Sequence, residues 1–402
     1  MKLLSQGNKA KSHHPDVALF YYFSILNIRH IKVAYGLNEG LALLPALLSR
    51  LQSYGIQNKA LSYASKDTIL VSLKDDHKLN PTLILADLHK TPLVIKETEI
   101  IPTLACGLVT QDDLELLSTP EIGEFSASHK IVKNVIRRGK WRERYIKDME
   151  RAVGLFKSID KLQLRYQPVY PTKNLAQGNE LYWESLSTHK DQGGIQKTLS
   201  SLERLCLTNY FDHHNLLKTI ATLNNDPTIR LGCNISPSSL CDDLWWQSIY
   251  SELEDSPSVS SRLVIEVTEE YEISSADYPI ATEIIKKLKS LGCIIALDDF
   301  GKSSSGFRNL AALDPEIIKI DMSYLHGARH SLESIGKLKA LIDFCKSSNM
   351  LCVLEGVETE ADLSVAREFQ ADLVQGYYFH KLPINGSTKR PFQQRYDPPI
   401  SD

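Results

Sequence analysis

The sequence predicts an α/β protein with a C-terminal (β/α)8 barrel of the TIM type, preceded by a smaller α/β domain. Its 402 residues exceed what one ordinary hydrophobic core supports, so more than one domain is expected. A charged segment at 129–160, with apolar residues at helical spacing, divides the chain. Beyond it, eight short apolar runs alternate with helical patterns, and this alternation is typical of a barrel.

The eight apolar runs have the length of strands, and turn signals bound them. Helical patterns such as 279–292 and 333–350 fill most of the gaps. Active sites of such barrels lie where the strands end, so the last residues of each run are the candidates for function. The runs are 162–170, 180–186, 231–236, 262–269, 293–299, 316–321, 351–356 and 372–379.

The ends of these predicted strands are polar. One glutamate after a strand is usually a helix cap or a solvated loop residue, but here carboxylates recur on strand after strand. Such a cluster would raise the pKa values of its members unless cations were bound. The residues concerned are Glu184, Asn234, Glu266, Asp298, Asp299, Lys319, Asp321, Glu355 and Gln375.

Oxygen ligands without histidine or cysteine favour Mg²⁺, Mn²⁺ or Ca²⁺ over zinc. The neighbours Asp298 and Asp299 can each hold a different ion, with Asp298 bridging the two. Two such ions suit in-line attack on phosphorus, and Lys319 can orient the attacking water or neutralise charge. The predicted chemistry is therefore hydrolysis of a phosphodiester or phosphomonoester.

Composition narrows the function classes further. The net charge of -3 argues against non-specific nucleic-acid binding by the whole chain. Seven dispersed cysteines without a CxxC pair indicate free thiols in a reducing compartment. The N-terminus has no apolar segment of signal-peptide length, and no run approaches the roughly 18 apolar residues of a spanning helix. A cytoplasmic protein without a membrane segment is expected.

The charged segment is predicted to be a connecting helix over 129–158, and this sets the domain limits. We expect domains at 1–128 and 159–385, and a frayed tail at 386–402. A docking surface or lever between domains is the alternative role of the helix. Its basic cluster, which includes Arg137 and Arg138, is also a candidate nucleic-acid patch, although nearby acidic residues dilute its field.

The C-terminal part resembles the EAL-domain cyclic-di-GMP phosphodiesterases. Eight motifs stand in the family's order over about 230 residues. They are YQPV (166–169), ESL (184–186), NISPSSL (234–240), EVTE (266–269), DDFG (298–301), KID (319–321), EGVET (355–359) and QGYYF (375–379).

The resemblance implies hydrolysis of cyclic di-GMP to linear pGpG with two Mg²⁺ or Mn²⁺ ions. It assigns Glu184, Asn234, Glu266 and Asp298 to the first metal, and Asp298, Asp299 and Glu355 to the second. Lys319 would position the attacking water, so Lys319, Glu355 and Glu184 are the expected catalytic residues. Gln167, Pro168, Ser236, Pro237 and Gln375 would contact the nucleotide, while Glu269, Asp321 and Glu358 would support the site, Glu269 by bracing the serine-rich loop.

The sequence also departs from the family pattern. Ser185 replaces the alanine of the motif, and Ser187-Thr188 replaces Leu-Arg, whose arginine touches substrate phosphate in the family. Lys302–Gly306 replaces a Thr-Gly-Tyr-Ser-Ser loop that supports metal binding and dimerisation. A catalytically inactive domain that binds cyclic di-GMP or a protein partner is therefore the alternative prediction. A homodimer through the EAL domain is a further implied partner.

The N-terminal part resembles a degenerate GGDEF domain, the cyclase partner often fused to EAL domains. The match covers 23–51 and a predicted strand pair at 61–73. Tyr63–Asp67 stands where the name-giving motif belongs, without its glycines or acid pair, and Asn27 and Arg29 occupy positions that the family uses for metal. This argues against cyclase activity and favours a regulatory or protein-binding role.

Overall fold

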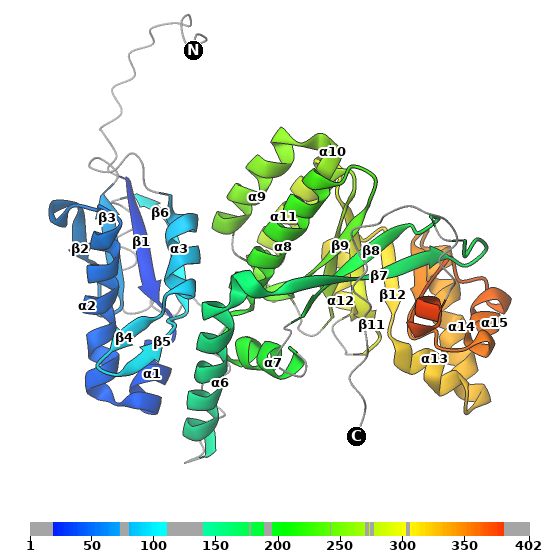
Figure 1. Ribbon diagram of the computed structural model, residues 1–402, viewed down its shortest axis with the longest axis horizontal. Coiled ribbons are helices and arrows are strands. Elements are labelled where there is room, and N and C mark those ends of the chain that lie inside the picture. The colour runs from blue at the N-terminus through cyan, green and yellow to red at the C-terminus, as the bar shows by residue number, and fades with distance from the viewer. Residues whose placement is uncertain are drawn as a thin grey trace, which may run out of the picture. The chain divides into compact units, whose positions relative to one another are not determined.

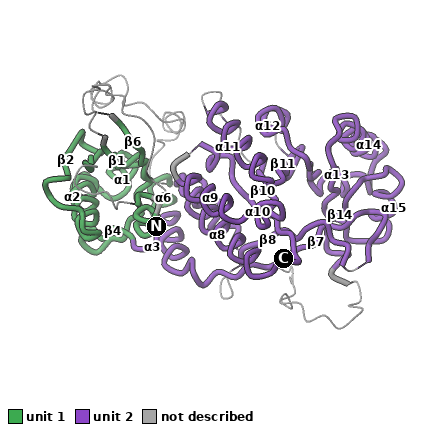
Figure 2. The backbone as a smooth tube through the Cα atoms, turned by 90° about the horizontal axis from the view of Figure 1, so that it is seen from above, with its two compact units in different colours: residues 1–88, 92–146 green, residues 89–91, 147–402 purple. Residues whose placement is uncertain are grey.

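The structure is a computed structural model, and its ribbon is drawn in Figure 1. The chain divides into two compact units, coloured separately in Figure 2: residues 1–88 with 92–146, and residues 89–91 with 147–402. The residues that the structure describes are 19–72, 80–110, 140–176, 178–188, 195–241, 243–269, 273, 277–302 and 306–381.

The first unit contains an antiparallel four-stranded sheet. Its strand order is β2-β3-β1-β6, formed by Leu61–Tyr63, Thr68–Ser72, Leu19–Ile25 and Leu104–Thr110. The predicted strand pair at 61–73 is confirmed, because β2 and β3 are hydrogen-bonded neighbours. The other elements are α1 (Ile28–Tyr35), α2 (Leu37–Ser53), η1 (Asn58–Ala60), α3 (Pro81–Lys90) and the hairpin β4 (Leu93–Ile95) and β5 (Thr98–Ile100).

Helix α2 forms because apolar residues recur on one of its faces. Leu43, Leu47 and Leu51 are four residues apart and fully buried, as expected for an amphipathic helix against a core. Asn27 is also buried in this unit. Its Oδ1 accepts the backbone N–H of Thr103 at 3.0 Å, and its Nδ2 lies 3.3 Å from the Tyr145 hydroxyl, so Asn27 ties the unit together.

The predicted connecting helix is present as α6 (Lys140–Lys157). The boundary between the two units falls inside it, between residues 146 and 147. Residues 129–139 of the predicted helix, Arg137 and Arg138 among them, lie outside the described residues. The predicted limits at 128 and 385 also lie outside them and stay predictions.

The second unit contains a closed eight-stranded barrel (Figure 1), so the predicted fold class is confirmed. Each of the eight apolar runs forms one strand. The strands are β7 (Gln163–Pro171), β8 (Tyr182–Thr188), β9 (Leu231–Ile235), β10 (Leu263–Thr268), β11 (Ile294–Phe300), β12 (Ile317–Ile320), β13 (Leu351–Leu354) and β14 (Leu373–Gln375).

One strand runs opposite to a regular (β/α)8 pattern. β7 is antiparallel to both of its neighbours, β8 and β14. The connection from β7 to β8 is only residues 172–181, whereas a parallel crossover needs about a dozen or more. A hairpin therefore replaces the first β-α-β unit, and the carboxyl end of β7 lies at the opposite rim from those of the other strands.

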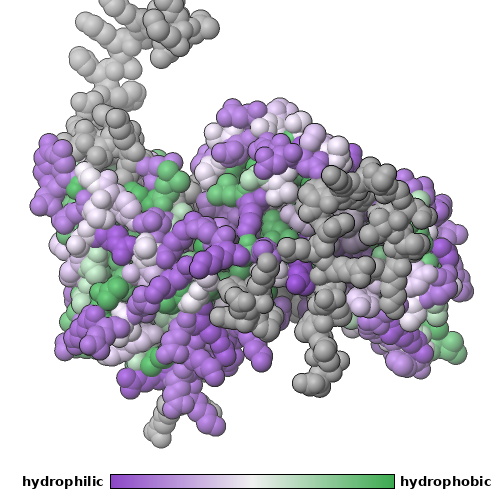
Figure 3. Space-filling view, in the orientation of Figure 1, coloured by the Kyte–Doolittle hydropathy of each residue, from purple (hydrophilic) through white to green (hydrophobic). Residues whose placement is uncertain are grey.

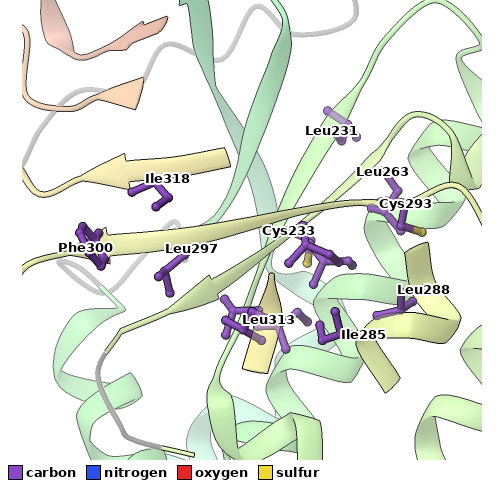
Figure 4. Packing of buried hydrophobic residues seen from close by; sticks show 14 of the residues in the cluster. Leu231, Cys233, Leu263, Ile285, Leu288, Cys293, Leu297, Phe300, Leu313 and Ile318 are labelled. Carbon is purple, nitrogen blue, oxygen red and sulfur yellow. The ribbon is translucent and has the colours of Figure 1, made fainter. Parts of the chain in front are cut away.

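Helices surround the barrel and enclose its main hydrophobic core. Figure 4 shows part of this packing, with Leu297, Phe300 and Ile318 on the strands and Ile285, Leu288 and Leu313 on the helices. The helical elements are η2 (Ile159–Lys161), α7 (Gln196–Leu205), α8 (Thr208–Asn225), η3 (Pro237–Cys241), α9 (Asp243–Asp255), α10 (Pro257–Ser260), α11 (Tyr278–Ser290), α12 (Gly306–Leu313), α13 (Met322–Ala328), α14 (Leu332–Ser347), α15 (Glu360–Glu368) and η4 (Tyr377–Lys381).

The helices of the described chain are too short or too polar to span a bilayer. The face drawn in Figure 3 mixes hydrophilic and hydrophobic residues.

Candidate active site

The barrel interior is layered, because side chains on each strand alternate between its inside and its outside. One layer is apolar and forms a buried cluster of its own, separate from the core beneath the helices. Its members are Val169, Tyr182, Val264, Ala296, Ile317, Val353 and Leu373. On β9, the equivalent position is Gly232, in register with Glu184 of β8 and Val264 of β10.

The next layer toward the carboxyl ends is polar. Side chains two residues apart on a strand point to the same side, so the residue two positions after each interior residue also points inward. On every strand except β7, this residue is polar. Gln167 lies two residues before Val169 because β7 runs the other way, and it is in register with Glu184. The polar layer consists of Gln167, Glu184, Asn234, Glu266, Asp298, Lys319, Glu355 and Gln375. The convergence predicted from the strand ends is therefore present.

Lys319 lies at the centre of this layer and is 1% exposed. Its Nζ contacts four carboxylates from four different strand ends. The distances are 3.0 Å to Glu184 Oε2, 2.8 Å to Glu266 Oε2, 2.8 Å to Asp298 Oδ1 and 3.1 Å to Glu355 Oε1. One ammonium thus faces three buried carboxyl groups and the partly buried Glu355, and it is too little positive charge to balance these four groups.

Burial is the largest influence on the pKa values of most of these acids. Burial raises the pKa of Glu266 to about 8 and the pKa of Asp298 to about 6, against the pull of the Lys319 ammonium. Burial likewise raises the pKa of Glu355 well above its usual value. For Lys319, burial alone would lower the pKa, but the surrounding carboxylates hold it well above normal.

Glu184 is the exception because amide donors stabilise its charge. Burial would raise its pKa, but Lys319, Asn234 and Gln375 bring it below the usual value. Asn234 Nδ2 donates to Glu184 Oε1 at 2.7 Å, and Gln375 Nε2 donates to Oε2 at 2.6 Å. Glu184 is therefore the carboxylate of this layer that the protein holds ionised and fixed in place.

Asp298 and Asp299 face the same site although they are adjacent in sequence. Neighbouring residues of a regular strand point to opposite faces, but the pairing of β11 with β12 is irregular between Leu297 and Phe300. Asp299 has φ 57°, in the left-handed region that aspartate tolerates better than most residues. This bulge brings carboxylate oxygens of Asp298, Asp299 and Glu355 within 4.8 Å of one another.

The donor set fits divalent cations. A second group, formed by Glu184, Glu266 and Asp298, also has its oxygens within 4.8 Å, and Asp298 belongs to both groups. Three buried oxygens in the layer, Asn234 Oδ1, Glu266 Oε1 and Gln375 Oε1, have no hydrogen-bond partner among the described residues. Carboxylate and amide oxygens are the ligands that Mg²⁺ and Mn²⁺ prefer. Unsatisfied ligand atoms and excess negative charge are both features that a bound cation corrects.

The residues predicted to contact the nucleotide are placed less uniformly. Gln167 and Gln375 are in the polar layer. Pro168 is not, because it alternates with Gln167 and is in register with Trp183, which packs against the outer core. A contact between Pro168 and the nucleotide therefore stays a prediction. Ser236 donates its backbone N–H to Asp212 Oδ2 at 2.8 Å and its hydroxyl to the same atom, and Pro237 is buried at the start of η3.

The predicted supporting acids have three different surroundings. Glu269 is 1% exposed at the end of β10, beside Gly306, where an added Cβ would lie 2.1 Å from its Oε1. Ser303–Ser305 of the loop it is predicted to brace lie outside the described residues, so that role stays a prediction. Asp321 caps α13 by accepting the Ser323 N–H at 2.9 Å. Glu358 pairs with Arg329 at 3.1 Å, and its side chain is 43% exposed.

Two residues beneath the polar layer were missed from the sequence. The Tyr182 hydroxyl lies 3.4 Å from Glu266 Oε2, and burial raises the pKa of this phenol well above normal. Gly232 leaves the space that the Glu266 carboxylate occupies, since a Cβ there would lie 1.9 Å from Oε1. The signal was available: both residues lie two positions before a predicted ligand on their own strand.

Gly232→Ala is expected to destabilise the protein by about 1–3 kcal/mol, as overpacking of a full core does. The methyl group would also clash with Tyr182 Cε2 at 2.8 Å, so neither neighbour can yield easily. Displacement of Glu266 should weaken Mn²⁺ binding as well. Urea unfolding in EDTA and calorimetric Mn²⁺ titration measure the two effects. Gly336→Ala on α14 is the control, because nothing lies within 4 Å of its added Cβ.

Comparison with known proteins identifies the class of this barrel. Residues 147–381 match the family described as EAL domain, which is more than half of the chain. The chain belongs to the EAL-domain family.

Curated relatives carry the same domain. The chain is 28% identical over 235 residues to cyclic di-GMP phosphodiesterase NbdA of Pseudomonas aeruginosa, covering 56% of this chain and 29% of that protein. It is 26% identical over 227 residues to cyclic di-GMP phosphodiesterase TpdA of Vibrio parahaemolyticus, covering 55% and 37%. The protein y4lL of Sinorhizobium fredii is 25% identical over 366 residues, which are 87% of this chain and 44% of y4lL. The chain thus spans less than half the length of these relatives.

One solved structure resembles the fold of both units. It is the S helix-GGDEF-EAL chain of Vibrio cholerae LapD in its apo form, with a TM-score of 0.50 and 18% identity. It covers 91% of this chain and 89% of its own. At this identity the likeness concerns the fold alone.

Proposed function

We propose that this chain hydrolyses cyclic di-GMP to linear pGpG with two Mg²⁺ or Mn²⁺ ions. The observation that carries the proposal is the pair of carboxylate groups that share Asp298 in the polar layer of the barrel. The EAL-domain membership and the relatives named as cyclic di-GMP phosphodiesterases support the choice of substrate.

The residues that would hold the ions are those of the two groups, joined by Asn234 through its unsatisfied Oδ1. When bound, such ions lower the pKa of an attacking water and stabilise charge on the phosphoryl oxygens. Glu184 is already ionised and fixed by two amide donors, so it can bind a cation without first losing a proton. Lys319 would orient the water through its ammonium. Gln167, in register with Glu184, would contact the nucleotide.

The test is hydrolysis of cyclic di-GMP by the purified chain in Mg²⁺ and in Mn²⁺, followed by chromatography of pGpG. Glu184→Gln keeps the side-chain shape but removes the ligand charge, and it should lower turnover about 100-fold or more. Glu368→Gln, an exposed change on α15, is the matched control and should leave turnover unchanged. Absence of pGpG at high enzyme concentration with either ion would refute the enzymatic proposal.

The second candidate is a catalytically inactive receptor of cyclic di-GMP. Thr188 favours it, because the family carries a phosphate-contacting arginine at this position. Direct binding measurements separate the two candidates. A receptor binds cyclic di-GMP without producing pGpG, whereas the enzyme produces pGpG only with metal.

For the first unit, we propose a GGDEF-like domain without cyclase activity that regulates the barrel or binds a partner. The sheet order, the β2–β3 hairpin and the fold likeness to LapD over 91% of the chain support it. Asn27 supports the absence of cyclase activity, because its side chain is hydrogen-bonded to Thr103 and Tyr145. We also propose that the chain forms a homodimer through its EAL domain and that it is located in the cytoplasm.

A further inference from the structure

The position of the missing family arginine is filled by a short side chain with a local role. Thr188 is the last residue of β8, and its hydroxyl donates to the backbone carbonyl of Gln163 at 3.3 Å. Gln163 is also its register partner on β7. The side chain of Thr188 therefore carries no charge toward a phosphate.

The neighbouring strand supplies an arginine beside this position. Arg165 on β7 lies directly opposite Leu186, between the pairs Gln163–Thr188 and Gln167–Glu184. Residues diagonal to one another across an antiparallel pair have Cα atoms about 7–8 Å apart, within reach of a long side chain. Arg165 is thus diagonal both to Thr188 and to the metal-site residue Glu184.

The side chain of Arg165 lies on the site face of the hairpin. Directly opposed residues share a face, so Arg165 and Leu186 lie on the same face as Gln167 and Glu184. The alternate residues confirm this independently: Tyr166 packs against the outer core, and the Ser187 hydroxyl donates to Asn215 of α8 at 2.7 Å. Tyr166 and Ser187 therefore face the helices, and Arg165 faces away from them.

The position of Arg165 along β7 also suits a contact with a ligand above the polar layer. Arg165 is two positions from Gln167, and a strand rises about 3.3 Å per residue. The Arg165 Cα therefore lies about 6–7 Å beyond the polar layer, toward the open rim where a ligand above the metal ligands would lie. Arg165 is partly buried, so a contact made there is less screened by solvent than one at an exposed surface.

We propose that Arg165 binds a phosphate of the dinucleotide and replaces, from β7, the arginine that Thr188 lacks on β8. This rests on the proposed ligand of the barrel and does not depend on whether the chain is an enzyme or a receptor. The guanidinium donates two parallel N–H groups to the non-bridging oxygens of a phosphodiester. On this proposal, the positive charge that is absent at residue 188 on β8 is supplied by the neighbouring strand β7.

The experiment measures binding of cyclic di-GMP by isothermal calorimetry in EDTA, at two salt concentrations, for the full chain and its variants. Arg165→Gln should weaken binding about 10- to 100-fold and reduce its salt dependence. Arg367→Gln on α15 removes the same charge from a half-exposed side chain and should change neither. The unfolding midpoint of each variant is recorded, because a merely structural role would lower it.

A second variant makes the relocation testable. Arg165→Gln combined with Thr188→Arg should regain most of the lost affinity, which a structural defect at residue 165 would not allow. If Arg165→Gln unfolds, Arg165→Lys takes its place, since it keeps the charge and stem but not the planar fork, and binding should fall about 3- to 10-fold.

The two levels of the proposal fail differently. Arg165→Gln that binds as tightly as wild type would overturn the role of Arg165 and leave the proposed function intact. A double variant no tighter than the single variant would overturn the relocation. Wild-type protein that neither binds nor hydrolyses cyclic di-GMP would overturn the proposed function, and the role of Arg165 with it.

Discussion

Asp298→Asn is expected to abolish metal-dependent hydrolysis and at the same time to stabilise the metal-free protein. Asp298 is the residue common to both carboxylate groups, so the amide weakens both proposed metal sites at once. Without metal, four carboxyl groups, three of them buried, face the single ammonium of Lys319. Replacement of one carboxylate by a neutral group of the same shape relieves that imbalance.

The sign of the stability effect follows from the pKa of the acid. Burial raises the pKa of Asp298 to about 6, so its ionised form weakens the fold increasingly as pH rises from the unfolded value near 4 to 6. Above pH 6 the asparagine variant avoids this and should gain about 1–3 kcal/mol in EDTA. Below pH 4, where wild type is protonated, the gain should vanish.

Urea unfolding in EDTA at pH 7.5 and pH 4 measures the predicted gain in stability. Turnover in Mn²⁺ measures the predicted loss of activity. Asp343→Asn on α14 is the control, because that carboxylate is 53% exposed and pairs only with Lys339 among the contacts described for it. A variant that is inactive and also less stable at pH 7.5 would mean that Asp298 contributes to the metal-free fold, and the excess-charge interpretation would be wrong.

The barrel was predictable because two local signals agree along the chain. Each apolar run has strand length, and most of the polar candidates lie two residues after an interior apolar residue, as Glu266 follows Val264 and Lys319 follows Ile317. The antiparallel direction of β7 was not predicted, although residues 172–181 are too few for a crossover. Strand identity follows from residue pattern, whereas strand direction depends on the length of the connection.

The conformation of Asp299 could not be predicted from sequence. Adjacent aspartates suggest two ligands, but regular strand geometry would place them on opposite faces of β11. The irregular pairing with β12 and the left-handed backbone of Asp299 resolve this, and both depend on the neighbouring strand. Lys302 then contacts Asp299 Oδ2 at 2.8 Å, so this position, which departs from the family pattern, supplies a counter-charge.

The central position of Lys319 is also a tertiary result. The sequence predicts a residue that orients water, but its four carboxylate partners come from β8, β10, β11 and the end of β13. In the structure its ammonium is the positive charge that these four groups share. Lys319 therefore has a proposed catalytic role, in orienting water, and a structural role, in neutralising the carboxylates. A bound metal ion can replace the second role but not the first.

Lys319→Met is expected to destabilise the metal-free protein by about 3–5 kcal/mol, because it leaves buried carboxylates without their cation. The side chain is 1% exposed, and methionine matches the length of its apolar stem, so loss of charge dominates over loss of packing. Mn²⁺ should stabilise the variant more than wild type, because the ions neutralise the same four groups and no longer compete with an ammonium. Hydrolysis should remain low even with metal, since no group then orients the water.

Urea unfolding in EDTA measures the predicted destabilisation, and urea unfolding in Mn²⁺ measures the predicted stabilisation by metal. Lys339→Met is the control: its ammonium is 56% exposed in a surface pair with Asp343, so the change should cost only about 0–1 kcal/mol and show no metal dependence. Equal stability of Lys319→Met and wild type in EDTA would show that the carboxyl groups are protonated and need no counter-ion. A deficit that Mn²⁺ does not repair would mean that these carboxylates do not form the metal site, and the proposed hydrolysis would lose its physical basis.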